Sequence, residues 1–198
     1  MPRNLIGAAL MLAAVFSALA PGIAAGDGAG EVDARLRESR ELTRQFQQRL
    51  KTELETAIAH GGPVAAIATC RERAPAIAAE LSAASGASVS RTAMRVRNPA
   101  NAPLPWQREA MARFEQRMAA GEPADKLELF ETPAGEGARY LKAIPTGPLC
   151  LTCHGGNLAA DVRSALRDMY PQDAATGFAA GDLRGAFSVV WPAETEAP

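Results

Sequence analysis

The sequence has 198 residues, and its 21 lysines and arginines against 22 aspartates and glutamates give a net charge of −1. This balance lacks the excess of basic residues that nucleic-acid binding needs, so we expect no nucleic acid as a partner. The three cysteines are an odd number, so at least one thiol must lie outside any disulfide pairing.

The first 25 residues are typical of a secretory signal peptide. Arg3 precedes an apolar run from Leu5 to Ala20, and the small residues Ala24 and Ala25 follow it. The run is too short and too poorly flanked for a membrane span, so we expect cleavage after Ala25 and export to the periplasm. Contact with the membrane would require that this segment stays uncleaved. Residues 26–198 are expected to form a single domain with one core.

Two helices are predicted next. Residues 31–60 contain no proline or glycine, and their apolar residues recur mostly every four positions, which indicates a long amphipathic helix. Gly61 and Gly62 are expected to end it, and Pro63 to begin a second helix that continues to about Leu81. Cys70 lies on the apolar face of this second helix. Pro75, which follows it, is expected to kink the helix.

Residues 88–96 alternate and are rich in valine, serine and threonine, which predicts a strand. Its arginines, Arg91, Arg95 and Arg97, are separated by even numbers of positions, four and two, so they would share one face of the sheet. Further elements are predicted downstream, after a proline-rich loop over 98–105. In all there are five of these elements: a helix over 106–120, strands over 126–132 and 138–144, a helix over 161–169 and a last strand over 186–191. Helices followed by mostly antiparallel strands predict an α+β fold.

The functional centre of the sequence is a C-x-x-C-H motif formed by Cys150, Cys153 and His154, which we expect in a loop between prolines and glycines. This spacing is that of c-type haem attachment, because two thiols three positions apart can form thioethers to the porphyrin while the imidazole ligates iron. Export supports this interpretation, because such attachment is completed outside the bacterial cytoplasm. The alternatives are a redox disulfide, or a zinc site that also uses Cys70 and His60.

The sequence resembles a bacterial family of domains of unknown function, which are single-haem c-type proteins with a PAS-like fold. They occur alone or as sensor portions of histidine kinases. The likeness covers nearly the whole mature chain. It is carried by Cys70-Arg71 with Pro75, Arg91-Thr92, Arg97 to Asn101 with Trp106, Cys150 to Gly155, Tyr170 to Asp173 with Gly177-Phe178, and Gly181 to Ala186.

The resemblance implies a PAS-like antiparallel sheet packed with helices around one covalently bound haem c. It also implies that Cys70 ligates the iron opposite His154. An exported protein with an unpaired thiol risks its oxidation, which favours the same role. The residues alone leave core packing open for Cys70, and they leave His60, a methionine or an open iron position as alternatives to it. The methionine candidates are Met94, Met111, Met118 and Met169.

Two haem carboxylates would need donors, for which Arg91, Arg97 and Arg184 are the candidates. We therefore expect a mono-haem cytochrome for electron transfer or redox sensing, with a redox partner protein or a membrane-bound signalling partner. The alternative is a haem-based sensor of small ligands that signals through a partner. An enzyme such as a peroxidase is disfavoured, because only His60 is left as a distal acid or base.

Overall fold

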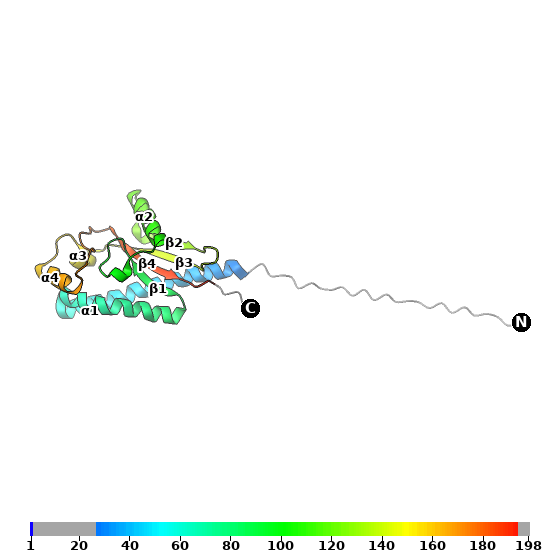
Figure 1. The fold of residues 1–198 in the computed structure, drawn as a ribbon, viewed down its shortest axis with the longest axis horizontal. Coiled ribbons are helices and arrows are strands. Elements are labelled where there is room, and N and C mark those ends of the chain that lie inside the picture. The colour runs from blue at the N-terminus through cyan, green and yellow to red at the C-terminus, as the bar shows by residue number, and fades with distance from the viewer. Residues whose placement is uncertain (2–26, 194–198) are drawn as a thin grey trace.

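The structure is a computed structural model that describes Met1 and residues 27–193, so the predicted signal peptide lies outside the described residues apart from Met1. Its fold is α+β, as predicted, with a long N-terminal helix, a four-stranded antiparallel sheet and further helices (Figure 1). Among the described residues, no helix is both long and apolar enough to cross a membrane.

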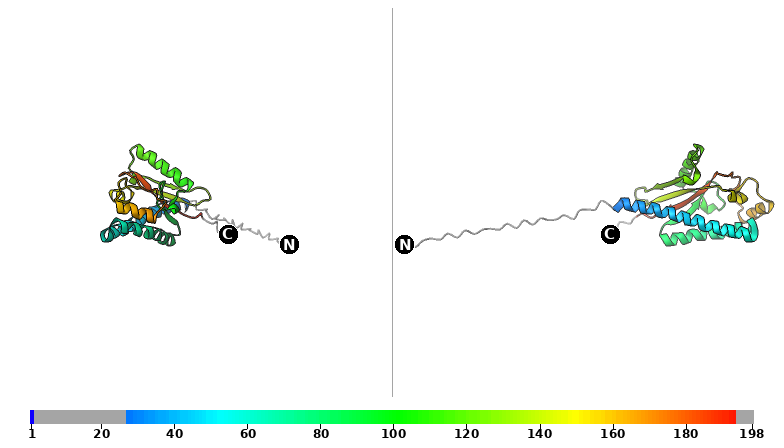
Figure 2. Two further views of the ribbon diagram at one scale, coloured as in Figure 1. Left: turned by 60° about the vertical axis from the view of Figure 1, so that its left-hand side comes forward. Right: turned by 180° about the vertical axis from the view of Figure 1, so that it is seen from behind.

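The N-terminal helix α1 (Asp27–Ser85) consists of two halves that fold back on each other (Figures 1 and 2). The interruption lies at Gly62, whose φ of 71° and ψ of −173° are readily adopted only by glycine. The predicted break at Gly61-Gly62 is therefore confirmed. Pro75 keeps helical φ and ψ angles in the second half, so the chain changes direction at Gly62 and not at Pro75.

The sheet has the order β1-β4-β3-β2, and every neighbouring pair is antiparallel. The strands are β1 (Ser88–Thr92), β2 (Glu128–Glu131), β3 (Arg139–Pro145) and β4 (Leu183–Val190). β1 is shorter than predicted, because the chain turns after Thr92 and the amide of Ala93 donates to the carbonyl of Asn101 at 3.4 Å. Arg95 and Arg97 therefore lie in the following loop, and the prediction that they share a sheet face with Arg91 is wrong.

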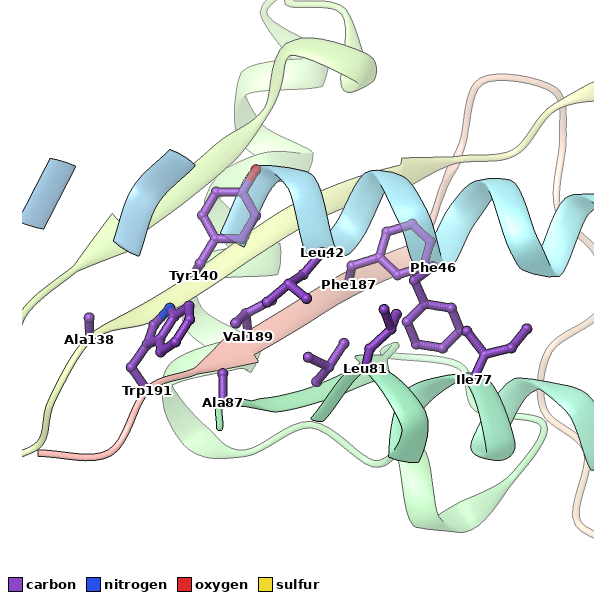
Figure 3. Close-up of a cluster of buried hydrophobic side chains, with 11 residues drawn as sticks. Leu42, Phe46, Ile77, Leu81, Ala87, Ala138, Tyr140, Phe187, Val189 and Trp191 are labelled. Carbon is purple, nitrogen blue, oxygen red and sulfur yellow. The ribbon is translucent and has the colours of Figure 1, made fainter. Parts of the chain in front are cut away.

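Helices cover both faces of the sheet, with α1 on one side and α2 (Pro105–Ala119) on the other (Figure 2). Successive strand residues point to opposite faces, so Tyr140 packs under α1 and Leu141 packs under α2. Figure 3 shows the cluster on the α1 side, which includes Phe46, Ile77, Phe187 and Val189. These two apolar layers hold α1 and α2 against the sheet.

A third apolar cluster lies at the end of the molecule where α1 turns back. There α4 (Ala160–Met169) packs Val162 and Leu166 against Ile67 of the second half of α1. Cys153 packs at the margin of this cluster. Its short helix α3 (Leu151–His154) thus lies beside the turn of α1 (Figures 1 and 2). The remaining helical segments are the 3₁₀ turns Pro99–Asn101, Ala124–Lys126 and Pro148–Cys150.

Candidate functional site

The C-x-x-C-H motif adopts helical turns and not the loop that was predicted. The 3₁₀ turn ending at Cys150 continues directly into α3, and the amide of Gly155 closes α3 by donating to the carbonyl of Leu151 at 3.0 Å. A Cβ atom at Gly155 would lie 2.6 Å from the same carbonyl oxygen, so only glycine fits there. Positions three apart on a helix lie on one side, which gives Cys150 and Cys153 a common face.

His154 is held in one tautomer. Its Nδ1 lies 2.6 Å from the carbonyl oxygen of Ala175, and a carbonyl only accepts hydrogen bonds, so Nδ1 carries the proton. Burial lowers the pKa of His154 to about 2, and the charges of Arg184 and Arg97 act in the same direction. The ring is therefore neutral, and its Nε2 lone pair is available to a metal, which is the arrangement expected of a ligating histidine.

The segment 175–178 fixes the position of the motif. Gly177 and Phe178 donate their amides to the carbonyls of Gly155 and His154, each at 3.0 Å. The Phe178 ring meets the His154 ring edge to face, with the centroids 6.3 Å apart. The imidazole is thus oriented by contacts from a loop that follows it in the sequence.

Arg97 connects this loop to the motif. Its Nε donates to Oδ2 of Asp173 at 3.1 Å, and its Nη2 donates to the carbonyl oxygens of Cys153 at 2.5 Å and Ala175 at 3.3 Å. Only 12% of the Arg97 side chain and 9% of the Asp173 side chain are exposed. Because protein groups use Nε and Nη2, only Nη1 remains for another anion. The structure therefore makes Arg97 the least suited of the three predicted carboxylate donors.

Cys70 lies half-buried in the second half of α1, and a negative charge on it would raise the pKa of Cys153. Burial raises the pKa of Cys70, while the positive charges of Arg91 and Arg97 oppose this shift and favour the thiolate. Burial also raises the pKa of Cys153, and Arg97 again opposes it. The fold therefore brings Cys70 to the same end of the molecule as the motif, and all three cysteines are free thiols.

Arg91 and Arg184 also belong to this region. Arg91 lies on the α1 side of β1, with its Cζ 5.6 Å from the centre of the Phe46 ring, and burial lowers its pKa. Arg184 lies 5.2 Å from the centre of the Phe178 ring, and burial and the neighbouring Arg91 lower its pKa to about 10. Within the described part of the chain, neither guanidinium forms an ion pair with a carboxylate. The pair could therefore accept an anionic group from a ligand.

The rival ligands lie in less suitable places. His60 is exposed, and its Nδ1 donates to the carbonyl of Thr56 at 2.8 Å. Met94 is exposed, and Met111 and Met118 belong to the cluster under α2. Met169 packs against the third cluster, as Cys153 does. Across residues 27–193, no three His, Cys, Asp or Glu side chains form a group that could hold a metal ion.

The pattern of the sequence assigns no role to Asp173, Phe178 or the Ala175 carbonyl. Asp173 and Phe178 do lie in stretches that carry the family resemblance, which was a usable signal. A backbone carbonyl has no such signal, because any residue type supplies one.

Comparisons with known proteins agree with this fold. No curated protein matches the sequence significantly. Among solved structures, the crystal structure of the cyanobacterial haem protein Tll0287 matches with a TM-score of 0.65 and 27% sequence identity, over 83% of this chain and 98% of that one. The sequence model of the Tll0287-like family matches residues 28–192. The chain therefore belongs to the Tll0287-like family.

Proposed function

We propose that this protein binds one haem c covalently through Cys150 and Cys153, with His154 and Cys70 as the axial ligands of the iron. The observation that carries this proposal is the His154 ring, whose Nδ1 proton is fixed on the Ala175 carbonyl beside two free thiols on one helical turn. Membership of a family named after a haem protein supports haem as the group bound. Arg91 and Arg184 are proposed to donate hydrogen bonds to the haem carboxylates.

The bound haem would supply reversible one-electron exchange. The protein's part is to hold it in a fixed and partly dry site. Phe178 and the carbonyl of Ala175 orient the His154 ring, and the third apolar cluster covers one side of Cys153. A rigid pair of ligands keeps the reorganisation on electron exchange small, which suits an electron carrier or a redox sensor.

The second ligand is proposed to be the Cys70 thiolate. Burial raises the pKa of the Cys70 thiol, and the positive charges of Arg91 and Arg97 oppose this shift, so that coordination to iron would complete the stabilisation of the thiolate. A thiolate donates electron density and stabilises ferric iron, so the reduction potential should lie below that of a cytochrome with His and Met ligands. We place the protein in the periplasm, with a redox partner protein or a membrane-bound signalling partner.

Small-ligand sensing is a second candidate, favoured by the place of Cys70 on α1. Both halves of α1 pack on the same face of the sheet. Loss of the Cys70 ligand would therefore change the position of a helix that contacts much of the domain. The two functions differ in the response of the reduced protein to carbon monoxide. If the protein is an electron carrier, carbon monoxide should leave its absorption spectrum unchanged. If it is a sensor, carbon monoxide should replace Cys70 as the ligand and change the spectrum.

Covalent attachment can be tested on the full chain expressed with a c-type haem maturation system. The purified protein should keep its haem through denaturation and acid-acetone extraction, and its pyridine haemochrome should be of the two-thioether kind. Cys153→Ala should weaken or abolish attachment, whereas the matched control Cys70→Ala should leave it covalent. Extraction of the haem from the wild type would overturn the proposal.

A further inference from the structure

We propose that Arg97 is a positioning residue that sets the strength of the hydrogen bond between His154 and the Ala175 carbonyl. This inference rests on the proposed function, because it concerns the iron ligand His154. It assigns to Arg97 control of the reduction potential rather than the binding of a haem carboxylate.

The geometry points to this role because one carbonyl oxygen serves two donors. The Ala175 oxygen accepts from Nδ1 of His154 at 2.6 Å and from Nη2 of Arg97 at 3.3 Å. The same Nη2 donates to the carbonyl of Cys153, the residue directly before His154, at 2.5 Å. Arg97 therefore contacts the backbone on both sides of the His154 hydrogen bond.

Asp173 completes the arrangement by holding the Ala175 peptide from its other end. Its Oδ1 accepts the Ala175 amide at 2.8 Å, while its Oδ2 accepts Nε of Arg97 at 3.1 Å. Ala175 is fully buried, and the neighbouring amide of Ala174 donates to the carbonyl of Val96 at 2.9 Å. The acceptor of the His154 proton is thus fixed by an almost buried ion pair and has little freedom to adjust.

The consequence for the iron follows from the charge of Arg97. A guanidinium that shares the Ala175 oxygen draws electron density from it, so the oxygen accepts the His154 proton more weakly. The imidazole then donates less density to the iron, which favours the reduced state. Removal of Arg97 should strengthen the His154 hydrogen bond and lower the reduction potential. Removal of the Asp173 charge should leave Arg97 uncompensated and raise it.

Arg95 provides a matched control within the same loop. Its Nη1 donates to the carbonyl of Thr176, next to Ala175, at 2.9 Å, and its Cζ lies 3.6 Å from the centre of the Phe178 ring. It is exposed and does not contact the carbonyls of Cys153 or Ala175. A general loss of loop packing should appear in Arg95→Gln as well, whereas the proposed effect should not.

The test measures midpoint potentials by spectroelectrochemistry on haem-loaded R97Q, R97K, D173N and R95Q. For R97Q we expect a fall that changes the ratio of oxidised to reduced protein at fixed potential about tenfold, which is ~59 mV for one electron. R97K keeps the positive charge but not the planar guanidinium, so its midpoint potential should fall less than that of R97Q. The midpoint potential of D173N should rise, and that of R95Q should stay close to the wild-type value.

Equal potentials in R97Q and R95Q, or a fall in D173N, would overturn the inference. If R97Q yields no loaded protein, the sign of the D173N shift decides the question, because D173N keeps the contacts of Arg97 to the two carbonyls. Failure of the proposed function would look different, since the wild type would then show no covalent haem at all. A loaded wild type with an unresponsive R97Q separates the two outcomes.

Discussion

The α1-side core and the candidate haem site both include residues of α1, but they differ in completeness. In the core, Phe46, Ile77 and Tyr140 are at most 1% exposed, and even the Trp191 ring nitrogen finds a partner in the Ser39 hydroxyl at 2.9 Å. At the site, the three thiols of Cys70, Cys150 and Cys153 are half-buried and free. The core is thus complete from the chain itself, whereas the site offers groups to a ligand.

Because the core and the candidate site use different residues, stability and ligand chemistry should be separable by mutation. Variants in the core should lower the free energy of unfolding with little effect on the ferric spectrum of the loaded protein. Variants at the site should do the reverse. The following variants test the separation, from the largest expected loss of stability to the smallest.

Phe46→Ala should cost the most. The ring is 1% exposed and packs 5.2 Å, centroid to centroid, from the Phe187 ring, so truncation leaves a cavity between α1 and β4. We expect a loss of about 3–5 kcal/mol in the free energy of unfolding, measured by urea titration of the full chain. Leu104→Ala, at a side chain that is 54% exposed, is the control and should change stability by less than about 0.5 kcal/mol. Similar losses in both variants would show that the core is not packed as described.

Gln107→Ala should cost less, about 1–3 kcal/mol, by leaving polar groups unpaired. The amide of Gln107 donates to the buried Ser188 hydroxyl at 2.9 Å, and its Oε1 accepts the amide of Leu104 at the start of α2. Adding Ser188→Ala to the variant removes one of the orphaned groups and should recover part of the loss. A double variant less stable than either single one would contradict this account of the α2 layer.

Glu128→Gln should change the dependence of stability on pH. The hydrogen bond from Arg40 lowers the pKa of Glu128 below its usual value of 4.5, and Tyr140 donates to the same carboxylate at 2.7 Å. A lowered pKa in the folded state stabilises the protein above pH 4.5, and this contribution is lost as the pH falls through the folded pKa.

The urea midpoints of wild type and Glu128→Gln should therefore converge between pH 7 and pH 3. Glu122→Gln is the control, because Arg117 also lowers the pKa of Glu122, but on the exposed surface. The gap between that control and the wild type should be small throughout. If the urea midpoints of wild type and Glu128→Gln differ by the same amount at every pH, the ion pair with Arg40 contributes nothing to the pH dependence of stability.

Cys70→Ala should affect stability least, by less than about 1 kcal/mol in the haem-free chain, since the thiol is half-buried and small. Its effect on the loaded protein should be large, with the ferric spectrum changing from a low-spin thiolate type to a form open to water or imidazole. Met169→Leu is the control and should leave the spectrum unchanged. An altered spectrum in Met169→Leu with an unchanged one in Cys70→Ala would make Met169 the ligand.

Periodicity predicted most of the fold, because the apolar spacing of α1, α2 and α4 and the alternation of the strands are local properties. It failed where a distant backbone group decides the outcome. The alternation after Thr92 continues through Arg95, yet the strand ends because Asn101 takes the amide of Ala93 and the hydroxyl of Thr92. No local pattern announces that acceptor.

The sequence predicted which side chains could carry the chemistry of the candidate site, but not which groups hold them in place. The spacing of Cys150, Cys153 and His154 alone suggested these three residues, and the role of Cys70 that the family resemblance implied stays a prediction. Three arginines were treated alike in the sequence because a guanidinium suits any carboxylate. Only the structure separates Arg97, whose Nε and Nη2 are bound by protein groups, from Arg91 and Arg184.

The order of the sheet leaves β1 and β2 as its two edges, which has a consequence for solubility. Unpaired edge strands can recruit strands of other molecules and start aggregation. β2 has only four residues and carries Glu128 and Glu131 at its two ends, both in ion pairs with arginines. A second copy that approached this edge would have to desolvate these charges. The short, charged strand therefore protects the open side of the sheet from edge-to-edge association.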